Sequence, residues 1–135
     1  MSSEMKVRTP DAESYCYPDV IIICGKAEYE DERQDVLLNP VVIIEILSPS
    51  TEAWDRGGKF ERYQTIPSLR EYLLVAQDKA RIEKYTVEGK RWVLDTCSGA
   101  DDTLRIESAS IEIPLSEIYE RVEFGESTRP TGGLR

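Results

Sequence analysis

The chain contains no histidine among its 135 residues. Ser-His and Cys-His nucleophilic dyads, histidine general bases and His-ligated zinc are therefore excluded within a single chain. Catalysis would have to use carboxylates, lysine, hydroxyl groups or a metal held by oxygen ligands. Because hard cations prefer oxygen ligands, these side chains favour magnesium or manganese.

Cysteines and long apolar runs are also scarce. Cys16, Cys24 and Cys97 are odd in number and show no C-x-x-C spacing, so neither a disulfide framework nor a zinc knuckle is indicated. No apolar run approaches the ~20 residues needed to span a bilayer. The polar start MSSEMKVRTP lacks a signal peptide's apolar segment. We therefore expect a cytoplasmic protein with no membrane partner.

Positive charge is in short supply over most of the chain. The formal net charge is −9, which argues against tight, non-specific binding to a polyanion. The charge is uneven, because residues 55–91 carry nine basic and six acidic side chains while both flanking parts are net acidic. A solvated helix face explains part of this excess, and the remainder supports a functional role for the lysine in this part of the chain, Lys59.

The predicted elements indicate a mixed sheet with helix packed on it, an α/β (α+β) domain. The predicted strands are Ser14–Cys24, Val41–Leu47, Arg70–Ala76, a hairpin of Arg81–Tyr85 with Arg91–Thr96, and part of Thr103–Ile113. The predicted helices are Thr51–Gln64 and Pro114–Arg121, and residues 25–39 are a predicted loop. We expect one domain over residues 1–124, poorly ordered at its very start, and a disordered tail over residues 125–135.

Glu45 interrupts the apolar, β-branched run of Val41–Leu47. Such a run is typical of a strand covered on both faces. Glutamate is almost never fully buried without a partner, because ionising it there costs several kcal/mol unless a cation or strong hydrogen bonds compensate. We therefore expect a positive group beside Glu45, unless Glu45 lies at an exposed strand end.

Asp19 is the one carboxylate in the first predicted strand. If that strand pairs with the strand of Glu45 with faces aligned, the two carboxylates converge, since neighbouring strands lie ~4.8 Å apart. The following helix places Asp55, Lys59 and Tyr63 on one side at i, i+4 and i+8. Lys59 would then supply the positive charge, although Asp55 and Lys59 could equally form an ordinary exposed ion pair.

Two further features lie beyond the Glu45 strand. Gly57 and Gly58 interrupt the predicted helix at roughly 1 kcal/mol each relative to alanine, which indicates a close backbone approach or a helix that starts just before them. Ser48 and Thr51 could be nucleophiles, but without histidine or an S-x-x-K pattern we predict turn and capping roles.

These residue types suit hydrolysis of a phosphodiester, which needs an activated water and neutralised charge on the phosphate. One or two divalent ions can supply both. The protein would offer two carboxylates on adjacent strands and a lysine that orients or deprotonates water, or stabilises the developing charge. Asp19, Glu45 and Lys59 meet this description.

The motifs resemble those of the PD-(D/E)XK nuclease superfamily. Pro18 and Asp19 supply its PD pair, and Glu45 its acidic residue, but Leu47 stands where the superfamily usually has lysine. Within the superfamily, four longer strings are similar to the Uma-two family of predicted endonucleases. They are PDV at Pro18–Val20, E-x-L-S-P-S-T at Glu45–Thr51, D-R-x-x-K-x-x-x-Y at Asp55–Tyr63 and E-Y-x-x-V at Glu71–Val75.

The resemblance spans residues 15–122 and implies a restriction-endonuclease-like core that cleaves nucleic acid, with DNA as the expected substrate. It implies that Asp19, Glu45 and the carbonyl of Ile46 bind Mg²⁺ or Mn²⁺, and that Lys59 is the catalytic cation, moved to the helix. Gln77 is a candidate accessory residue. Family members usually carry a helix and strands before the PD strand, so we expect missing or reduced N-terminal elements. A homo-oligomer would cover the sheet face exposed by their loss.

Two alternatives stay open. A nuclease-like fold could act as a non-catalytic interaction or oligomerisation module, or be a truncated inactive homologue, which the short N-terminus and the net charge of −9 favour. A hydrolase acting on another phosphate ester would have the same sequence signature.

Overall fold

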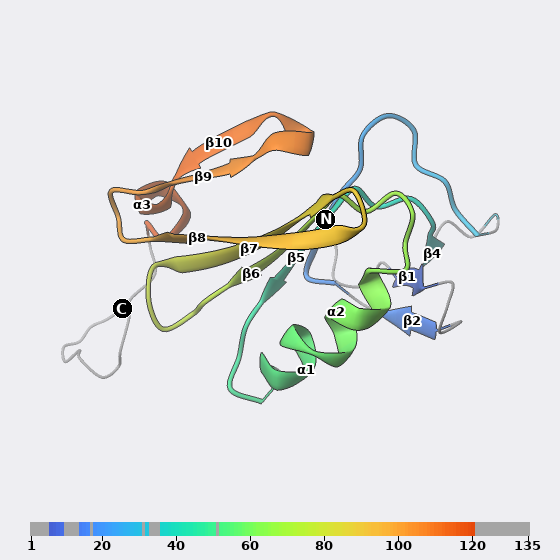
Figure 1. The fold of residues 1–135 in the computed structure, drawn as a ribbon, viewed down its shortest axis with the longest axis horizontal. Coiled ribbons are helices and arrows are strands. Elements are labelled where there is room, and N and C mark those ends of the chain that lie inside the picture. The colour runs from blue at the N-terminus through green and yellow to red at the C-terminus, as the bar shows by residue number, and fades with distance from the viewer. Residues whose placement is uncertain are drawn as a thin grey trace.

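The computed structural model describes residues 6–9, 14–16, 18–30, 32, 36–50 and 52–120. Its central element is a five-stranded sheet with the strand order β3-β5-β6-β7-β8 (Figure 1). The strands are β3 Val20–Ile22, β5 Val42–Ile46, β6 Glu71–Val75, β7 Arg81–Glu88 and β8 Arg91–Ser98. Strands β5 and β6 are parallel and the other pairs are antiparallel. The sheet is mixed, as the sequence predicts.

Both faces of this sheet are covered, which explains why β5 and β6 are almost continuously apolar. Helices α1 (Glu52–Arg56) and α2 (Gly58–Tyr63) cover one face. The other face carries the hairpin of β9 (Thr103–Ile106) and β10 (Ile111–Pro114), the 3₁₀ helix η1 (Glu107–Ala109) and helix α3 (Leu115–Ile118).

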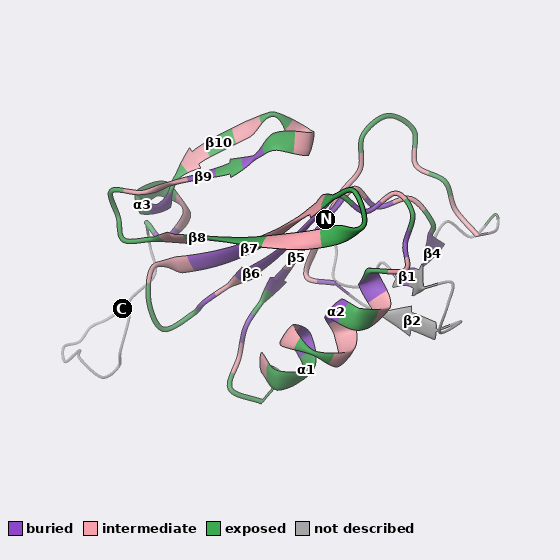
Figure 2. Cartoon of the chain, viewed as in Figure 1, coloured by how far each residue is buried: buried purple, intermediate pink, exposed green. Residues whose placement is uncertain are grey.

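Alternation along the central strands divides their side chains between two cores. Ile43 and Tyr72 pack on the helical face, whereas Val42 and Leu73 pack under the β9–β10 hairpin. Buried residues are concentrated in β5, β6 and β7 (Figure 2). Side chains of β5 that face α2 are therefore those on the same face of the strand as Ile43. Glu45, two residues later, lies on that face.

The predicted strand Ser14–Cys24 is wrong as a single element. Its first part forms β2 (Ser14–Cys16), which pairs with β1 (Lys6–Thr9), while its second part forms β3 and pairs with β5. Pro18 lies between them, and proline cannot donate to a strand ladder.

The second, three-stranded sheet has the order β2-β1-β4, where β4 is Val36–Leu37. Strand β1 forms within the polar N-terminal stretch, and Val7 is fully buried. The very start of the chain, expected to be poorly ordered, lies outside the described residues. Strand β4 lies within the predicted loop 25–39. The predicted disordered tail at residues 125–135 lies outside the described residues.

The predicted helix Thr51–Gln64 is two short helices. They are separated at Gly57, whose φ of −109° and ψ of −86° are not helical. A Cβ at Gly58 would lie 2.0 Å from the ring of Trp54. A close approach therefore does occur at the glycine pair, but the Trp54 side chain makes it, not the backbone. The predicted N-cap at Thr51 lies outside the described residues.

The C-terminal half follows the sequence closely. The predicted β7–β8 hairpin forms, with Glu88 opposite Arg91 at its turn. The irregular segment Thr103–Ile113 is a second hairpin that folds back at η1, and the last predicted helix is confined to α3. No helix in the described ranges is long and apolar enough to cross a membrane.

Candidate active site

Glu45 lies on the helical face of β5 and is buried, with 2% of its surface exposed. It is therefore not at an exposed strand end. The Lys59 ammonium lies 3.1 Å from Glu45 Oε2, and the Tyr63 hydroxyl donates to the same oxygen at 3.0 Å. The positive group expected beside Glu45 is thus Lys59 on α2, with Tyr63 as a second hydrogen-bond donor.

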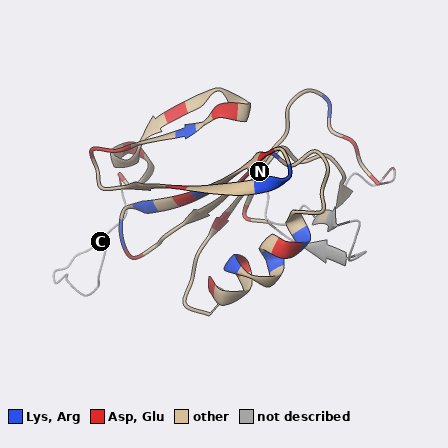
Figure 3. Cartoon of the chain, in the orientation of Figure 1, with Lys and Arg blue, Asp and Glu red and all other residues tan. Residues whose placement is uncertain are grey.

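Asp55 joins this group from the end of α1. Its Oδ1 lies 3.4 Å from Lys59 Nζ, and the side chains of Asp55 and Lys59 are 3% and 15% exposed. The pair is therefore not an ordinary surface ion pair. Acidic and basic residues occur together along the two helices (Figure 3). Asp55 is absent from the predicted site, although its i, i+4 spacing from Lys59 is a visible signal.

Asp19 lies beside the same stretch of β5. The register pairs Val20 with Ile44, so Asp19, one residue earlier, faces the position of Glu45. The backbone N–H of Ile46 donates to Asp19 Oδ2 at 2.7 Å. The structure thus brings Asp19, Glu45 and Lys59 to one region, with Asp19 held against the backbone directly after Glu45.

Leu47, which occupies the usual lysine position of the resembled superfamily, is 6% exposed and packs in the core under the helices. Leucine is uncharged, so position 47 supplies no cation to the site. Lys59 on helix α2 approaches Glu45 instead.

The Glu45 carboxyl has an unusual proton affinity. Burial raises its pKa from 4.5 to about 7, although the Lys59 ammonium and the hydrogen bonds from Lys59 and Tyr63 oppose this rise. For Lys59, burial acts to lower the pKa, but the negative charges of Glu45 and Asp55 and the hydrogen bond to Glu45 outweigh burial and raise it. Lys59 therefore remains an ammonium while Glu45 is poised to exchange a proton near neutral pH.

The raised pKa of Glu45 predicts a pH dependence of stability. The folded state retains the Glu45 proton to a higher pH than the unfolded state, so the free energy of unfolding falls as pH rises between about 4.5 and 7. Relative to Glu45→Gln, the wild type should lose on the order of 3 kcal/mol across this window. Urea unfolding of both proteins in chelator, from pH 4 to pH 8, measures the difference. Parallel stability curves would contradict it.

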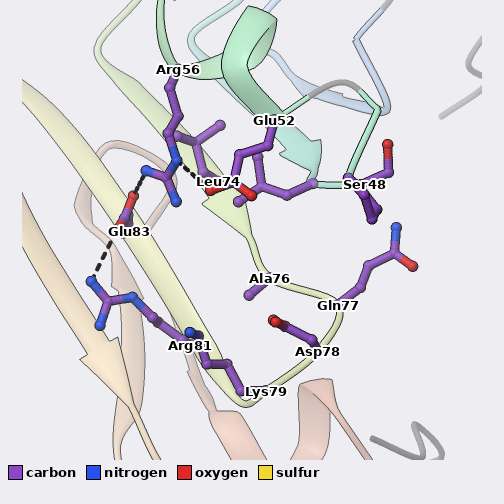
Figure 4. A pocket seen from close by; sticks show the side chains of 12 residues that line it. Ser48, Glu52, Arg56, Leu74, Ala76, Gln77, Asp78, Lys79, Arg81 and Glu83 are labelled. Atoms are coloured by element: carbon purple, nitrogen blue, oxygen red, sulfur yellow. Dashed lines mark hydrogen bonds and ion pairs between the residues drawn. The ribbon is translucent and has the colours of Figure 1, made fainter. Parts of the chain in front are cut away.

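A pocket of about 530 Å³ lies on the same face of the sheet as Glu45. Glu45 pairs with Leu74 across β5 and β6, and Leu74 pairs with Glu83 across β6 and β7. Leu74 and Glu83 line the pocket, so it begins one strand away from Glu45 (Figure 4). Gln77 also lines the pocket and is exposed there, not among the Glu45 contacts.

Charged side chains linked by hydrogen bonds and ion pairs line this pocket (Figure 4). Arg56 donates to Glu83 and, through Nε, to Glu52 Oε2 at 2.7 Å. Arg81 donates to the other oxygen of Glu83 at 2.9 Å. The two guanidinium groups lower the pKa of Glu83 despite the opposing effect of burial. Sequence reasoning missed this arrangement, since Arg56 and Glu83 are 27 residues apart.

Among the described residues, no group of three or more His, Cys, Asp or Glu side chains is arranged to hold a metal ion. A cation at this site would therefore need backbone oxygen or water in addition to two carboxylates.

Comparisons with known proteins place the chain in a family. A family model described as "Putative restriction endonuclease", Uma2, matches residues 1–116. In Synechocystis sp. (strain ATCC 27184 / PCC 6803 / Kazusa), Uncharacterized protein sll1609 is 38% identical over 117 residues, covering 86% of this chain and 62% of the relative. Uncharacterized protein slr1290 of the same strain is 32% identical over 123 residues, covering 91% and 64%. The chain thus spans less than two thirds of either curated relative.

A solved structure supports the fold. It is described as the crystal structure of "a putative nuclease belonging to DUF820" from Anabaena variabilis ATCC 29413. The two chains superpose with a TM-score of 0.67 at 14% identity, over 87% of this chain and 65% of the other. The fold is therefore restriction-endonuclease-like, and from the family model over residues 1–116 this chain belongs to the Uma2 family.

Proposed function

We propose that this protein is a divalent-metal-dependent endonuclease that hydrolyses phosphodiester bonds in DNA. The observation that carries the proposal is the contact between the buried carboxylate of Glu45 and the Lys59 ammonium at 3.1 Å, with Asp19 bonded to the next backbone amide. Membership of a restriction-endonuclease-like family favours nucleic acid over other phosphate esters as the substrate.

The donor set fits a hard cation. Asp19 and Glu45 offer carboxylate oxygens and Ile46 a backbone carbonyl, the ligand types that Mg²⁺ and Mn²⁺ prefer. When bound, a divalent ion supplies an activated water and neutralises charge on the phosphate. Burial of Glu45 also leaves a carboxylate that is costly to ionise, and a cation would offset that cost.

The remaining residues act on substrate and water. The Lys59 ammonium orients the attacking water or stabilises negative charge as it develops on the phosphate. Tyr63 fixes the rotamer of Glu45 through its hydrogen bond at 3.0 Å. Both side chains come from one short helix, so their spacing is set by that helix.

The pocket of about 530 Å³ is the proposed path for the nucleic acid beyond the scissile bond. Arg56, Lys79 and Arg81 line it and can contact backbone phosphates, and Gln77 lies at its edge. Glu52, Asp78 and Glu83 balance these three cations, so binding should be weak and sensitive to salt.

Manganese titration by calorimetry tests the proposal. The wild type should bind Mn²⁺, and Asp19→Asn and Glu45→Gln should each weaken binding at least ~10-fold by removing an oxygen ligand. Asp101→Asn and Glu88→Gln, which change exposed carboxylates of the same types, are the matched controls. No binding by the wild type at millimolar metal would contradict the assignment.

The alternative is a non-catalytic, nuclease-like interaction module. Two observations favour it: the net charge of −9, and the lack of a three-residue metal cluster among the described residues. The sequence predicts self-association. Self-association would be the function of a non-catalytic module, but a nuclease could also self-associate. Sedimentation analysis measures it directly.

A further inference from the structure

Asp55 is a buried carboxylate whose Oδ1 lies 3.4 Å from Lys59 Nζ without making a hydrogen bond. It is 2% exposed, and its Oδ1 is the one buried side-chain oxygen or nitrogen in the described ranges that has no hydrogen-bond partner. A buried acceptor without a hydrogen bond costs free energy. Most such atoms in folded proteins are paired, so this exception requires an explanation.

The position of Asp55 is fixed from two sides. The Tyr72 hydroxyl on β6 donates to the backbone carbonyl of Asp55 at 2.9 Å, and Tyr72 is itself fully buried. The chain then leaves the helical conformation at Gly57. The backbone of Asp55 is thus anchored to the sheet beneath it.

Lys59 lies between two buried carboxylates. Its Nζ is 3.1 Å from Glu45 Oε2, where it makes a hydrogen bond, and 3.4 Å from Asp55 Oδ1, where it does not. The two distances differ by only 0.3 Å, so a small rotation of the lysine side chain would exchange one acceptor for the other.

We propose that Asp55 is a positioning residue that receives the Lys59 ammonium when a divalent cation binds to Glu45. The inference rests on the proposed function. A cation on Glu45 repels the ammonium next to it, and Asp55 Oδ1, already 3.4 Å from Lys59 Nζ but without a hydrogen bond, is an acceptor toward which Lys59 can move. Lys59 is then held beside the metal without competing for Glu45.

The charges of the cluster support this exchange. With all four groups ionised, Asp19, Glu45, Asp55 and Lys59 sum to −2, which one divalent cation neutralises. Without Asp55, the same cation would leave a positive charge in a largely buried site, which is unfavourable.

A double-mutant cycle on Mn²⁺ affinity tests the proposal, with calorimetry as the readout. Asp55→Asn keeps the size of the side chain but removes its charge, and it should weaken Mn²⁺ binding about 10-fold because Lys59 then stays on Glu45. In the Lys59→Met background the competing ammonium is gone, so adding Asp55→Asn should change affinity by less than about 2-fold. An equal loss in both backgrounds, or no loss in either, overturns the proposal.

A crystal structure of the wild type with Mn²⁺ gives a second measurement that does not depend on any variant folding. Lys59 Nζ should lie closer to Asp55 than to Glu45, the reverse of the present order. Retention of the Glu45 contact with metal bound overturns the inference while leaving the proposed nuclease intact. If the wild type binds no Mn²⁺, both the inference and the proposed nuclease function are wrong.

Discussion

Asp19→Asn, Glu45→Gln and Lys59→Met should each reduce metal-dependent DNA cleavage at least ~10²-fold. In the proposed function, the first two changes remove a charged oxygen ligand, so the cation and the water that it would activate are lost together. The third removes the ammonium that lies 3.1 Å from Glu45, which in the proposed function stabilises the negative charge that develops on the phosphate in the transition state. Cleavage of plasmid DNA at low salt with Mg²⁺ or Mn²⁺ measures these effects.

The three variants should differ in metal affinity. Asp19→Asn and Glu45→Gln should lose both cleavage and Mn²⁺ binding, whereas Lys59→Met should lose cleavage and retain binding. Asp101→Asn, Glu88→Gln and Lys90→Met make the same chemical changes at exposed positions and should cleave like the wild type. Full activity in all three site variants, purified and folded, would refute the assignment.

Glu71→Ala should lower the free energy of unfolding by about 3–5 kcal/mol. Glu71 is 1% exposed on the face of β6 opposite Glu45. It accepts hydrogen bonds from the backbone amides of Glu107 and Ser108 at 3.3 and 3.1 Å and from the Ser108 hydroxyl. Removing it leaves Lys84, whose Nζ lies 3.6 Å from Glu71 Oε2, buried without its carboxylate partner.

The double variant Glu71→Met with Lys84→Met is the matched comparison. Replacing both members of a buried ion pair by apolar side chains is often close to neutral, because no charge is left unpaired. We therefore expect the double variant to be more stable than Glu71→Ala. Urea denaturation of the three proteins measures the order. A loss below about 1 kcal/mol for Glu71→Ala would mean that Glu71 does not hold η1 against the sheet.

Local sequence patterns predicted much of the fold. The apolar runs of β5 and β6 and the turn between β7 and β8 are visible because their signal lies within a few residues. The prediction failed where pairing partners decide the structure. The segment from Ser14 to Cys24 reads as one strand by composition, but its two parts belong to different sheets.

The candidate site shows the same division. A glutamate inside an apolar strand requires a compensating group wherever that strand is buried, and the sequence offers Lys59 at a suitable distance along the chain. Asp55 could not be distinguished from a surface residue in the same way. Its backbone carbonyl accepts a hydrogen bond from Tyr72, which lies 17 residues away on β6, and no local pattern specifies that contact.

By itself, the sequence determined the available chemistry: with no histidine, any catalysis uses carboxylates, lysine, hydroxyl groups or a metal held by oxygen. It also determined that Glu45 would need a partner, because burying an ionised carboxylate is costly. Only the tertiary structure decided that Lys59 stands between the buried carboxylates of Glu45 and Asp55, and that Arg56 and Arg81 meet at Glu83. These contacts follow from the register of β5, β6 and β7 and from the helices packed across them, which no local pattern specifies.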